Sequence, residues 1–414
     1  MANVSSSNGL EKRPKLRFPR FDEPYRTTPL GEIASLVNRT DPKSNAPIMM
    51  LSAGNGFIMQ SEKYSKDNTG QSLKKYVLLK QGELAYNHGA SKVKQFGCCY
   101  ELTEPEARIP YVYHFFKINE DEYTTYVAMA LNNAKMDQQL KRLVSSSARM
   151  DGLLNISFED YMSVTLHLPS FIEQKHIADF LKKLDKRIAY QKRLITSLKK
   201  YKRGVFEAIF SRRLRLLPKE EQKDWKIFKL NEFASRITKK NNGTTDIPLT
   251  ISAQYGLIDQ RDFFSKVVAS TDMSGYYLLR KGEYAYNRST SNEYPFGSIK
   301  RLELYAEGAV STLYLCFSIN ENIVVSDFAK WYFESSQWYR NINEICAEGA
   351  RNHGLLNVPT NGFFNTAHIL PSDIKEQMAI ATFLSLIQDK LERSQKGLDQ
   401  LKQLRNGLLQ RLFI

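Results

Sequence analysis

The chain contains the stretch GELAYN at residues 82–87, and a closely similar stretch, GEYAYN, at residues 282–287. The pair Phe96-Gly97 likewise returns as Phe296-Gly297, again 200 residues later. Between these matches the two parts of the sequence differ freely. The spacing is far too long for a solenoid repeat, so it indicates a duplicated domain.

Two further matches extend the repeat to the end of each copy. RMDGLLN at 149–155 returns as RNHGLLN at 351–357 with an offset of 202, and EQ at 173–174 returns at 376–377 with an offset of 203. Because the offset grows by only three residues, we expect one fold with small loop insertions. A shared scaffold with two different surfaces is typical of a protein that reads two targets.

Length and composition agree with a two-domain protein that binds a polyanion. The chain has 414 residues, and its 59 basic against 44 acidic residues give a net charge of +15, which favours nucleic acid as a partner. There is no apolar run of membrane-spanning length and no signal peptide, so we expect a cytoplasmic protein without a membrane partner. Four cysteines without disulfide or zinc spacing are expected to be reduced: Cys98, Cys99, Cys316 and Cys346.

The predicted fold class is α+β. Two mixed α/β domains are expected at 21–171 and 223–373, after a disordered basic tail at 1–20. A long helix with a linker at 172–222 follows the first domain, and a second long helix at 374–414 follows the second. Strands are predicted at 75–80, 83–86, 111–118, 276–279, 283–286 and 309–319, and helices at 122–143 and 326–345.

The two long helices show the sharpest periodicity, with apolar residues at alternating steps of four and three. Polar interruptions occur at Gln191 and Lys202 in the first helix and at Ser394 and Arg405 in the second. One such helix alone could be an ordinary amphipathic surface helix, but two that match position for position predict a coiled-coil seam. The seam residues are Ile177, Leu181, Leu184, Ile188, Ile195, Leu198, Val205, Ile209, Ile380, Leu384, Ile387, Leu391, Leu398, Leu401, Leu408 and Leu412.

Two equivalent units in one chain tend to pack about a pseudo-two-fold axis, which predicts an antiparallel helix pair with a domain at each end. The seam pattern reads the same in both directions, so every apolar level can align. The 32 steps from Ile177 to Ile209 span roughly 48 Å. One turn of B-DNA is about 34 Å, so such a spacer can seat two domains in successive major grooves.

Catalytic and metal-binding signatures are absent from the sequence. It has no phosphate-binding glycine loop, no dinucleotide fingerprint, no His-Glu-x-x-His and no Cys-x-x-Cys. It also lacks the Asn/Asp-Pro-Pro-aromatic tetrapeptide with which amino-methyltransferases hold their target amine. We therefore expect no catalytic residues, no metal site and no cofactor in this chain.

The polar loops after the repeated Ala-Tyr-Asn are the candidate DNA-binding sites. Arg, Lys, Asn and Gln side chains reach base edges, and Ser and Thr favour phosphates; a solvated hairpin loop is the alternative. A second polar cluster precedes the end of each domain, where the repeated Arg and Gly could equally serve a backbone turn. The candidates are Asn87, His88, Ser91, Lys92, Lys94, Gln95, Arg149, Asn287, Arg288, Ser289, Thr290, Asn292, Tyr294, Arg351, Asn352 and His353.

Residues 182–215 hold thirteen Lys and Arg against only Asp185 and Glu207. A solvated helix face is the usual explanation for such a run. The density also suits contact with phosphates or with an acidic partner surface, and the sequence does not separate these two.

Taken together, the chain resembles the DNA-specificity subunit of type I restriction-modification systems over essentially its whole length. Each domain is followed by a long helix that begins near Leu-Pro and Glu-Gln, at 168–174 and at 370–377. The stretch from Trp225 to Glu232 resembles the opening Trp…Leu-x-Glu of a target recognition domain. The first copy departs mildly from that opening, because Tyr25 stands where Trp is common.

The resemblance implies that each target recognition domain reads one half of a bipartite double-stranded DNA target. The helices would set the gap and bind two modification subunits, which carry S-adenosylmethionine and methylate adenine at N6. A restriction subunit, attached through the modification subunits, would use ATP and Mg. Two other readings stay open: a stand-alone two-headed DNA-binding regulator, and an enzyme with an unfamiliar site.

Overall fold

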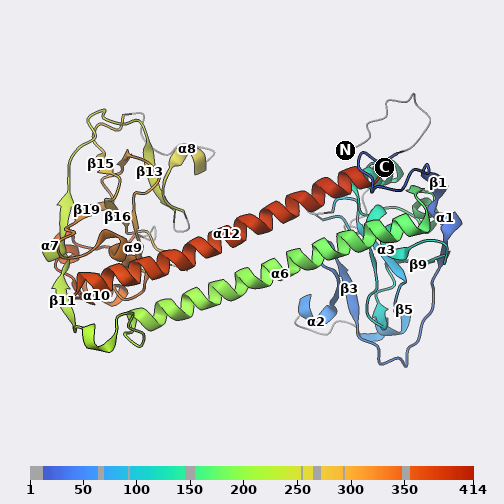
Figure 1. Cartoon of the computed structure of the whole chain (residues 1–414), viewed down its shortest axis with the longest axis horizontal. Helices are drawn as coiled ribbons and strands as arrows, with labels where there is room; N and C mark the ends of the chain where they lie inside the picture. The colour runs from blue at the N-terminus through green and yellow to red at the C-terminus, as the bar shows by residue number, and fades with distance from the viewer. Residues whose placement is uncertain are drawn as a thin grey trace. The chain divides into compact units, whose positions relative to one another are not determined.

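The computed structural model describes residues 13–63, 70–91, 94–144, 154–252, 255–263, 272–291, 294–346 and 355–414. Its contacts divide the chain into two units. Unit 1 comprises Met1–Lys192 and Lys396–Ile414, and unit 2 comprises Arg193–Gln395. Each unit contains one β-rich domain and one part of each of two long helices (Figure 1).

The domain of unit 1 is built from short strands joined by short helices. Its elements are β1 (Arg26–Pro29), α1 (Leu30–Ile33), β2 (Ala34–Leu36), β3 (Met49–Ser52), β4 (Gly56–Met59), α2 (Gln60–Lys63), η1 (Gly70–Lys75), β5 (Val77–Lys80), β6 (Leu84–Asn87), β7 (Cys98–Glu101), β8 (Glu106–Ile109), β9 (His114–Ile118), α3 (Thr124–Ala130), α4 (Ala134–Leu143), α5 (Phe158–Met162) and β10 (Thr165–Leu168), after which the long helix α6 (Phe171–Phe210) begins.

The domain of unit 2 repeats this order after a short linker. Its elements are η2 (Lys219–Glu221), β11 (Trp225–Lys229), α7 (Leu230–Phe233), β12 (Ala234–Ile237), β13 (Pro248–Ser252), β14 (Gly256–Asp259), α8 (Gln260–Phe263), β15 (Tyr277–Arg280), β16 (Tyr284–Asn287), β17 (Ser298–Arg301), β18 (Glu307–Val310), β19 (Leu315–Ile319), α9 (Ser326–Glu334), α10 (Tyr339–Ile345), α11 (Thr360–Phe364) and β20 (Ala367–Pro371), followed by the long helix α12 (Ile374–Leu412).

The repeated Ala-Tyr-Asn stretch forms a central strand in both domains. An antiparallel sheet with the order β2-β9-β6-β7 in unit 1 corresponds to β12-β19-β16-β17 in unit 2. Leu84 of β6 lies opposite Phe116 of β9, and Tyr284 of β16 lies opposite Phe317 of β19. All four side chains are buried. The repeated Ala85 and Tyr86, like Ala285 and Tyr286, are also buried, and apolar burial explains why these residues return unchanged.

Two further pairings complete each domain. In unit 2 the strands β14-β13-β18-β15 form a sheet, whereas in unit 1 the pairs β3-β4 and β5-β8 are linked by a parallel bridge between Ile48 and Arg108. In addition, β1 pairs with β10 and β11 pairs with β20. This last pairing brings the first and last strands of each domain together where the long helix begins.

The helix predicted at 122–143 is wrong as a single element, because it is interrupted between α3 and α4. The Asn132 side chain donates to the Ala128 carbonyl oxygen at 2.9 Å, and the Asn133 side chain accepts from the backbone of Lys135 and Met136. Asn133 is therefore the N-cap of a new helix. Asparagine competes with the helical backbone for hydrogen bonds, and two consecutive asparagines end the first helix here.

Unit 2 is interrupted at the equivalent place. The helix predicted at 326–345 is divided into α9 and α10, where Ser335 Oγ donates to the Tyr332 carbonyl oxygen at 2.6 Å. The Trp338 indole donates to the Phe333 carbonyl oxygen at 3.0 Å, and Trp338 is fully buried. The strand predicted at 309–319 is likewise divided between β18 and β19.

In unit 1 the first part of α6 packs against the last part of α12. Ile177 and Leu181 share an apolar cluster with Leu408 and Leu412. Further along α6, the Asp185 carboxylate binds the Arg405 guanidinium. Because later residues of α6 meet earlier residues of α12, the two helices run in opposite directions.

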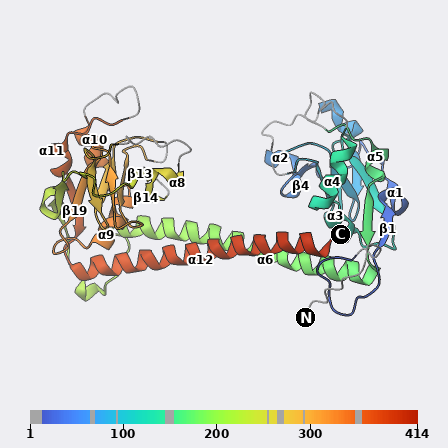
Figure 2. The same cartoon turned by 90° about the horizontal axis from the view of Figure 1, so that it is seen from above.

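Unit 2 shows the same antiparallel packing with the helix parts exchanged (Figures 1 and 2). Val205 and Ile209 near the end of α6 share a cluster with Ile380 and Leu384 near the start of α12. The predicted fold class, α+β with two β-rich halves and two long helices packed together, is therefore confirmed. Every residue of the predicted seam is buried or half-buried in the structure.

The segment before the first domain packs against α6 and the end of α12 within unit 1. The Leu16 N–H donates to the Arg411 carbonyl oxygen at 2.9 Å, and the Phe18 ring meets the rings of His176 and Phe180 edge-on. The prediction of a disordered tail is therefore wrong for residues 13–20, because apolar side chains within a basic sequence anchor it. Residues 1–12 lie outside the described part of the chain.

This anchoring repeats a contact of unit 2. There the Leu214 N–H donates to the Ala208 carbonyl oxygen at 3.0 Å. Ala208 and Arg411 stand 203 residues apart, the offset of the two long helices. In unit 1 the N-terminal segment therefore bonds to the end of α12. In unit 2 the linker after α6 bonds to the end of α6 in the same way.

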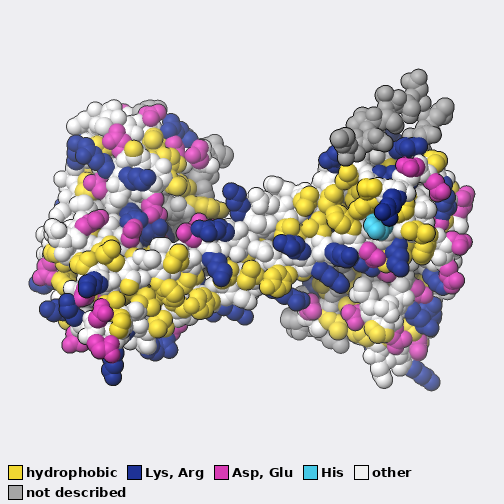
Figure 3. Space-filling view, in the orientation of Figure 1, with side chains coloured by type: hydrophobic (Ala, Val, Ile, Leu, Met, Phe, Trp, Pro, Cys, Tyr) yellow, Lys and Arg dark blue, Asp and Glu magenta, His cyan; other side chains and the backbone are white. Residues whose placement is uncertain are grey.

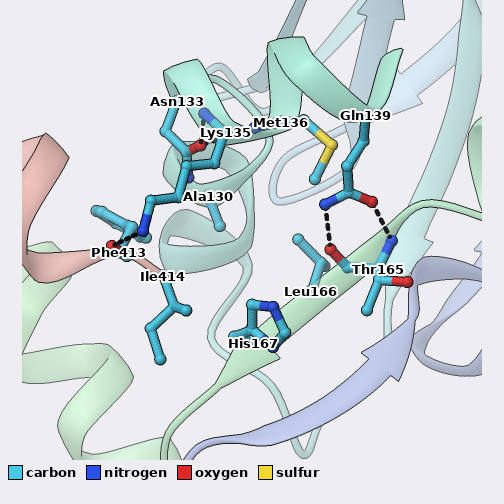
Figure 4. A pocket seen from close by; sticks show the side chains of 10 residues that line it. All are labelled: Ala130, Asn133, Lys135, Met136, Gln139, Thr165, Leu166, His167, Phe413 and Ile414. Carbon is cyan, nitrogen blue, oxygen red and sulfur yellow. Dashed lines mark hydrogen bonds between the residues drawn. The ribbon is translucent and has the colours of Figure 1, made fainter. Parts of the chain in front are cut away.

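The last residues of the chain, which belong to unit 1, line a pocket together with residues of α4 and β10 (Figure 4). The Phe413 ring stacks on Tyr126 at 5.0 Å, and Lys135 Nζ lies 3.5 Å from the Phe413 carbonyl oxygen. Beside them, the Gln139 amide bonds both the N–H and the carbonyl oxygen of Thr165 at 2.9 Å. The two contacts of Phe413 tie the end of α12 to the domain.

The repeated Gln at the start of each long helix joins the helix to its domain. Gln174 accepts from the Tyr123 N–H at 3.0 Å and donates to the Pro169 carbonyl oxygen at 2.9 Å. In unit 2, Gln377 accepts from the Val325 N–H at 2.7 Å and donates to Pro371 at 2.9 Å. Both glutamines are fully buried, so their partners satisfy groups that would otherwise be costly to bury.

The repeated Glu makes a second link. Glu173 is 0 % exposed and binds Arg17 through two hydrogen bonds of 2.9 and 2.7 Å. Glu376, also 0 % exposed, binds Arg215 in the same bidentate manner. These hydrogen bonds raise the pKa of both arginines, so each pair keeps its charges and fastens the segment before a domain to the helix after it.

No helix within the described ranges is long and apolar enough to cross a membrane.

Candidate nucleic-acid interface

The loops that follow β6 and β16 are closed at their base by the same hydrogen bond. Tyr86 Oη donates to the Phe96 carbonyl oxygen at 2.7 Å, and Tyr286 Oη donates to Phe296 at 2.8 Å. Both tyrosine rings are buried and stack on an aromatic side chain of α5 or α11, namely Tyr161 at 3.8 Å and Phe363 at 4.9 Å. The repeated Tyr therefore fixes where each loop begins and ends.

The glycine after each Phe is required by the backbone. Gly97 has φ +81° and Gly297 has φ +79°, a region that side chains rarely adopt. A Cβ atom at Gly97 would also collide with the Asn87 carbonyl oxygen, and one at Gly297 with the Asn287 carbonyl oxygen. The repeated Phe-Gly is thus part of the loop's closure.

Asn87 and Asn287 shape the first turn of each loop. The Asn87 side-chain oxygen accepts from the Gly89 N–H at 2.8 Å, and that of Asn287 accepts from the Ser289 N–H at 3.0 Å. This is the Asx turn that asparagine favours. Because the repeated Asn has this local role, its return in both copies does not by itself indicate contact with a base.

The tip of each loop is bracketed by a serine. The Lys94 N–H donates to Ser91 Oγ at 3.0 Å, and the Tyr294 N–H donates to Ser291 Oγ at 3.2 Å. Ser91 and Ser291 stand 200 residues apart, which is the signal that identifies them as scaffold. The residues between, including the candidates Lys92 and Asn292, lie outside the described ranges.

His88 braces the first loop from inside. It is only 7 % exposed, and its two ring nitrogens lie 3.0 Å from the Leu154 carbonyl oxygen and 2.7 Å from that of Val112. The neighbouring His114 ring is 4.9 Å away, and burial lowers the pKa of His114. A ring nitrogen of His114 lies 3.0 Å from the Ile156 carbonyl oxygen, so both histidines make hydrogen bonds to the protein backbone.

Arg288 takes the place of His88 in unit 2. Its guanidinium donates to the carbonyl oxygens of Leu313 at 2.9 Å and Val358 at 3.4 Å, and its side chain is only half-buried. The two residues therefore reach equivalent segments of their domains by different chemistry. Sequence reasoning missed this bracing role because both side chains are also suited to bases and phosphates.

The remaining described candidates differ in their exposure to solvent and in whether they already contact other parts of the protein. Gln95 and Ser289 are exposed, and Thr290 is half-buried. Lys94 Nζ donates to the Asn132 carbonyl oxygen at 2.7 Å, and the Tyr294 ring lies under Lys300 Nζ at 5.4 Å. Among the described candidates, Gln95 and Ser289 are thus the exposed polar side chains at the loop edges.

The second candidate cluster, with Arg149, Arg351, Asn352 and His353, lies outside the described residues. Its C-terminal flank is described in both units. The Leu154 N–H donates to the His88 carbonyl oxygen at 2.9 Å, and the Leu356 N–H donates to that of Arg288 at 3.0 Å. The segment that follows each cluster is therefore held beside the first loop.

Three of the four cysteine thiols, Cys98, Cys99 and Cys316, are buried. Burial raises the pKa of the Cys98 thiol to about 11 and that of the Cys316 thiol to about 12. Cys99 is fully buried and Cys346 is half-buried, and all four are free thiols. High thiol pKa values suppress the nucleophilic thiolate. Within the described ranges, no three His, Cys, Asp or Glu side chains are placed to hold a metal ion.

Each domain therefore offers a loop that is closed at its base by a hydrogen bond and has neutral polar side chains at its edge. Hydrogen-bond donors and acceptors of this kind can read base edges or contact phosphates, provided that the loop enters a groove.

Comparison with solved structures identifies the fold. The S subunit of the type I restriction-modification system from M. genitalium matches with a TM-score of 0.56 at 13% identity, covering 97% of this chain and 99% of that chain. The HsdS subunit from Thermoanaerobacter tengcongensis matches with a TM-score of 0.50 at 14% identity, covering 96% and 98%. No family model and no curated protein matches the sequence.

The chain thus has the fold of type I specificity subunits over nearly its full length. The predicted resemblance to these subunits is confirmed at the level of structure, through two β-rich halves and two long packed helices.

Proposed function

We propose that this chain is the DNA-recognition subunit of a type I restriction-modification complex in the cytoplasm. Each β-rich domain reads one half of a bipartite target in the major groove, through the loops after β6 and β16. The chain contributes no catalysis and holds no cofactor. S-adenosylmethionine belongs to the modification subunits, and ATP and Mg belong to the restriction subunits that join through them.

The observation that carries this proposal is the duplicated loop on a shared fold. The Tyr-Asn, Ser and Phe-Gly that shape the loop are the same in both copies, whereas the remaining loop positions differ. A constant closure with variable tips is suited to reading two different short sequences. The net charge of +15 supports a polyanionic partner.

The two long helices support the second part of the proposal, that they set the gap between the half-sites and bind two modification subunits. α6 is one continuous helix of 40 residues and α12 one of 39, each about 60 Å long. Exposed apolar side chains such as Leu386 and Leu404 on α12 are suited to partner subunits.

The decisive experiment is genome-wide mapping of N6-methyladenine in the source cells with and without this gene. The proposal expects a split motif, with two constant parts around a fixed gap, that disappears when the gene is deleted. An unchanged methylation map combined with altered transcription would instead identify a stand-alone regulator. Methylation by the purified chain alone would identify an enzyme.

A further inference from the structure

The outward face of α6 carries a line of basic side chains. Lys186, Arg193 and Lys200 follow one another at intervals of seven residues and are all exposed. In a helix they are about 10.5 Å apart and point to the same side. Lys199 and Arg203 are exposed beside this line.

The equivalent face of α12 lacks this charge. The helices align at an offset of 203 residues, so the five positions correspond to Asp389, Lys396, Gln403, Lys402 and Asn406, all exposed. The net charge of the five positions is therefore +5 on α6 and +1 on α12. Because the seams match while the outward faces do not, the basic face is not a requirement of helix packing.

Internal pairing does not account for the basic face. Of the two acidic residues in 182–215, Asp185 binds Arg405 and Glu207 binds Arg213. Elsewhere on α6, Lys182 donates to Thr125 and Lys202 donates to Gln388. In the linker after α6, Arg215 binds Glu376. Within the described residues, the five side chains of the basic face have no ion pair, so like charges repel along the helix.

The composition of this face favours phosphates over an acidic protein surface. Three of its five residues are lysine, which is depleted in protein interfaces but is a common phosphate ligand. Lys and Arg side chains are visible along the helices in a space-filling view (Figure 3). Tyr190 and Tyr201 are exposed on the same helix at 67 % and 52 %.

We propose that the basic face of α6 (Lys186, Arg193, Lys199, Lys200 and Arg203) binds the sugar-phosphate backbone of duplex DNA without reading its sequence. The inference rests on the proposed function, since the bound DNA would be the segment between the two half-sites. The two helices then have different tasks. α6 neutralises phosphates, and the exposed leucines of α12 contact protein partners.

The repeat supplies a matched control for the test. In the full-length chain, R193E/K199E is compared with K396E/K402E, which changes the equivalent positions of α12 by the same charge. Binding to a mixed-sequence duplex of about 40 base pairs is measured over a series of salt concentrations. The slope of log K, the association constant, against the logarithm of the salt concentration is negative. Losing two phosphate contacts reduces the magnitude of this slope by about 1.8.

We expect this reduction for R193E/K199E, and a change of less than about 0.5 for K396E/K402E. Equal reductions in both variants would overturn the proposal, because net charge alone would then explain binding. A wild-type slope in R193E/K199E would also overturn the proposal and would indicate that the basic face binds an acidic protein surface instead.

The test also separates this inference from the function on which it rests. If the wild-type chain shows no salt-dependent DNA binding, the proposed function fails. If the wild type binds and only the predicted difference between the variants is missing, the inference about α6 fails alone. Circular dichroism melting of each variant, together with the milder R193Q/K199Q, checks that the fold is retained.

Discussion

Arg405 forms an ion pair with Asp185 in unit 1, at the position where Lys202 donates to the Gln388 side-chain oxygen at 2.7 Å in unit 2. Both pairs follow the offset of 203 residues, so the repeat preserves a long cation opposite a polar acceptor at one level of the seam. In unit 1 the acceptor is charged, and in unit 2 it is neutral. These polar levels favour the observed register of the helices, because a slip would place a cation against an apolar residue.

The Arg405–Asp185 pair is expected to contribute little net stability. Its side chains are 31% and 40% exposed, so a double-mutant cycle with R405Q and D185N should give a coupling of about 0.5–1 kcal/mol, weaker at high salt. This coupling free energy is measured by hydrogen exchange of the backbone amides of residues 400–410 in the wild type, the two single variants and the double variant. A coupling that does not respond to salt would contradict this assignment.

Replacing the buried Glu376 should destabilise unit 2 strongly. E376Q leaves Arg215 without its carboxylate, which typically costs about 3 kcal/mol. All three tryptophans (Trp225, Trp331 and Trp338) lie in unit 2, so their fluorescence during denaturation reports that unit. E173Q, the equivalent change in unit 1, is the control and should move the tryptophan transition much less; equal shifts would refute this assignment.

Gly297 should be far less tolerant than Gly282, although both have positive φ. A Cβ at Gly282 meets nothing within 4 Å, so G282A should cost about 1 kcal/mol. G297A adds a collision with the Asn287 carbonyl oxygen and should cost about 3 kcal/mol. Tryptophan-detected denaturation compares the two, and similar costs would mean that the loop shifts without penalty.

Unit 2 should lose stability as the pH falls below about 6.5. Burial lowers the pKa of His368 to about 4, and its ring bonds Tyr332 Oη and Thr366 Oγ1, both at 2.8 Å. Between pH 6.5 and 4 the unfolded chain binds a proton that the folded chain does not, so protons favour unfolding. The loss approaches about 1.4 kcal/mol per pH unit.

The control for this pH dependence is H368Q, which removes the titrating group. Wild type and H368Q are compared by tryptophan-detected denaturation at pH 7.5, 6.5 and 5.5. The difference in the free energy of unfolding between wild type and H368Q should shrink as the pH falls. A constant difference would show that His368 does not titrate in this range.

A change at one loop should alter the reading of one half of the target. If the proposed function holds, Q95A removes an exposed amide from the first loop and should relax discrimination at one base by about 1–3 kcal/mol. The other half of the motif should stay unchanged in a methylation map. Loss of specificity in both halves at once would point to a defect in folding instead.

The sequence by itself determined the duplication, the two β-rich domains and the paired helices. These features are periodic, and a 3.5-residue apolar repeat or a 200-residue offset is visible without coordinates. It also revealed the repeated Glu-Gln, Phe-Gly and Ala-Tyr-Asn. It did not reveal the breaks at Asn132–Asn133 and Ser335, because side-chain bonding to the local backbone overrides helical periodicity.

Only the tertiary structure decided which polar residues serve the scaffold. His88, Lys94 and Asn87 carry the chemistry expected of DNA ligands, yet their bonds go to backbone groups distant in sequence or one turn away. Arg17, in a segment predicted to be disordered, reaches Glu173 across 156 residues. Burial and long-range hydrogen bonding determine these roles, and neither is encoded in the local sequence pattern.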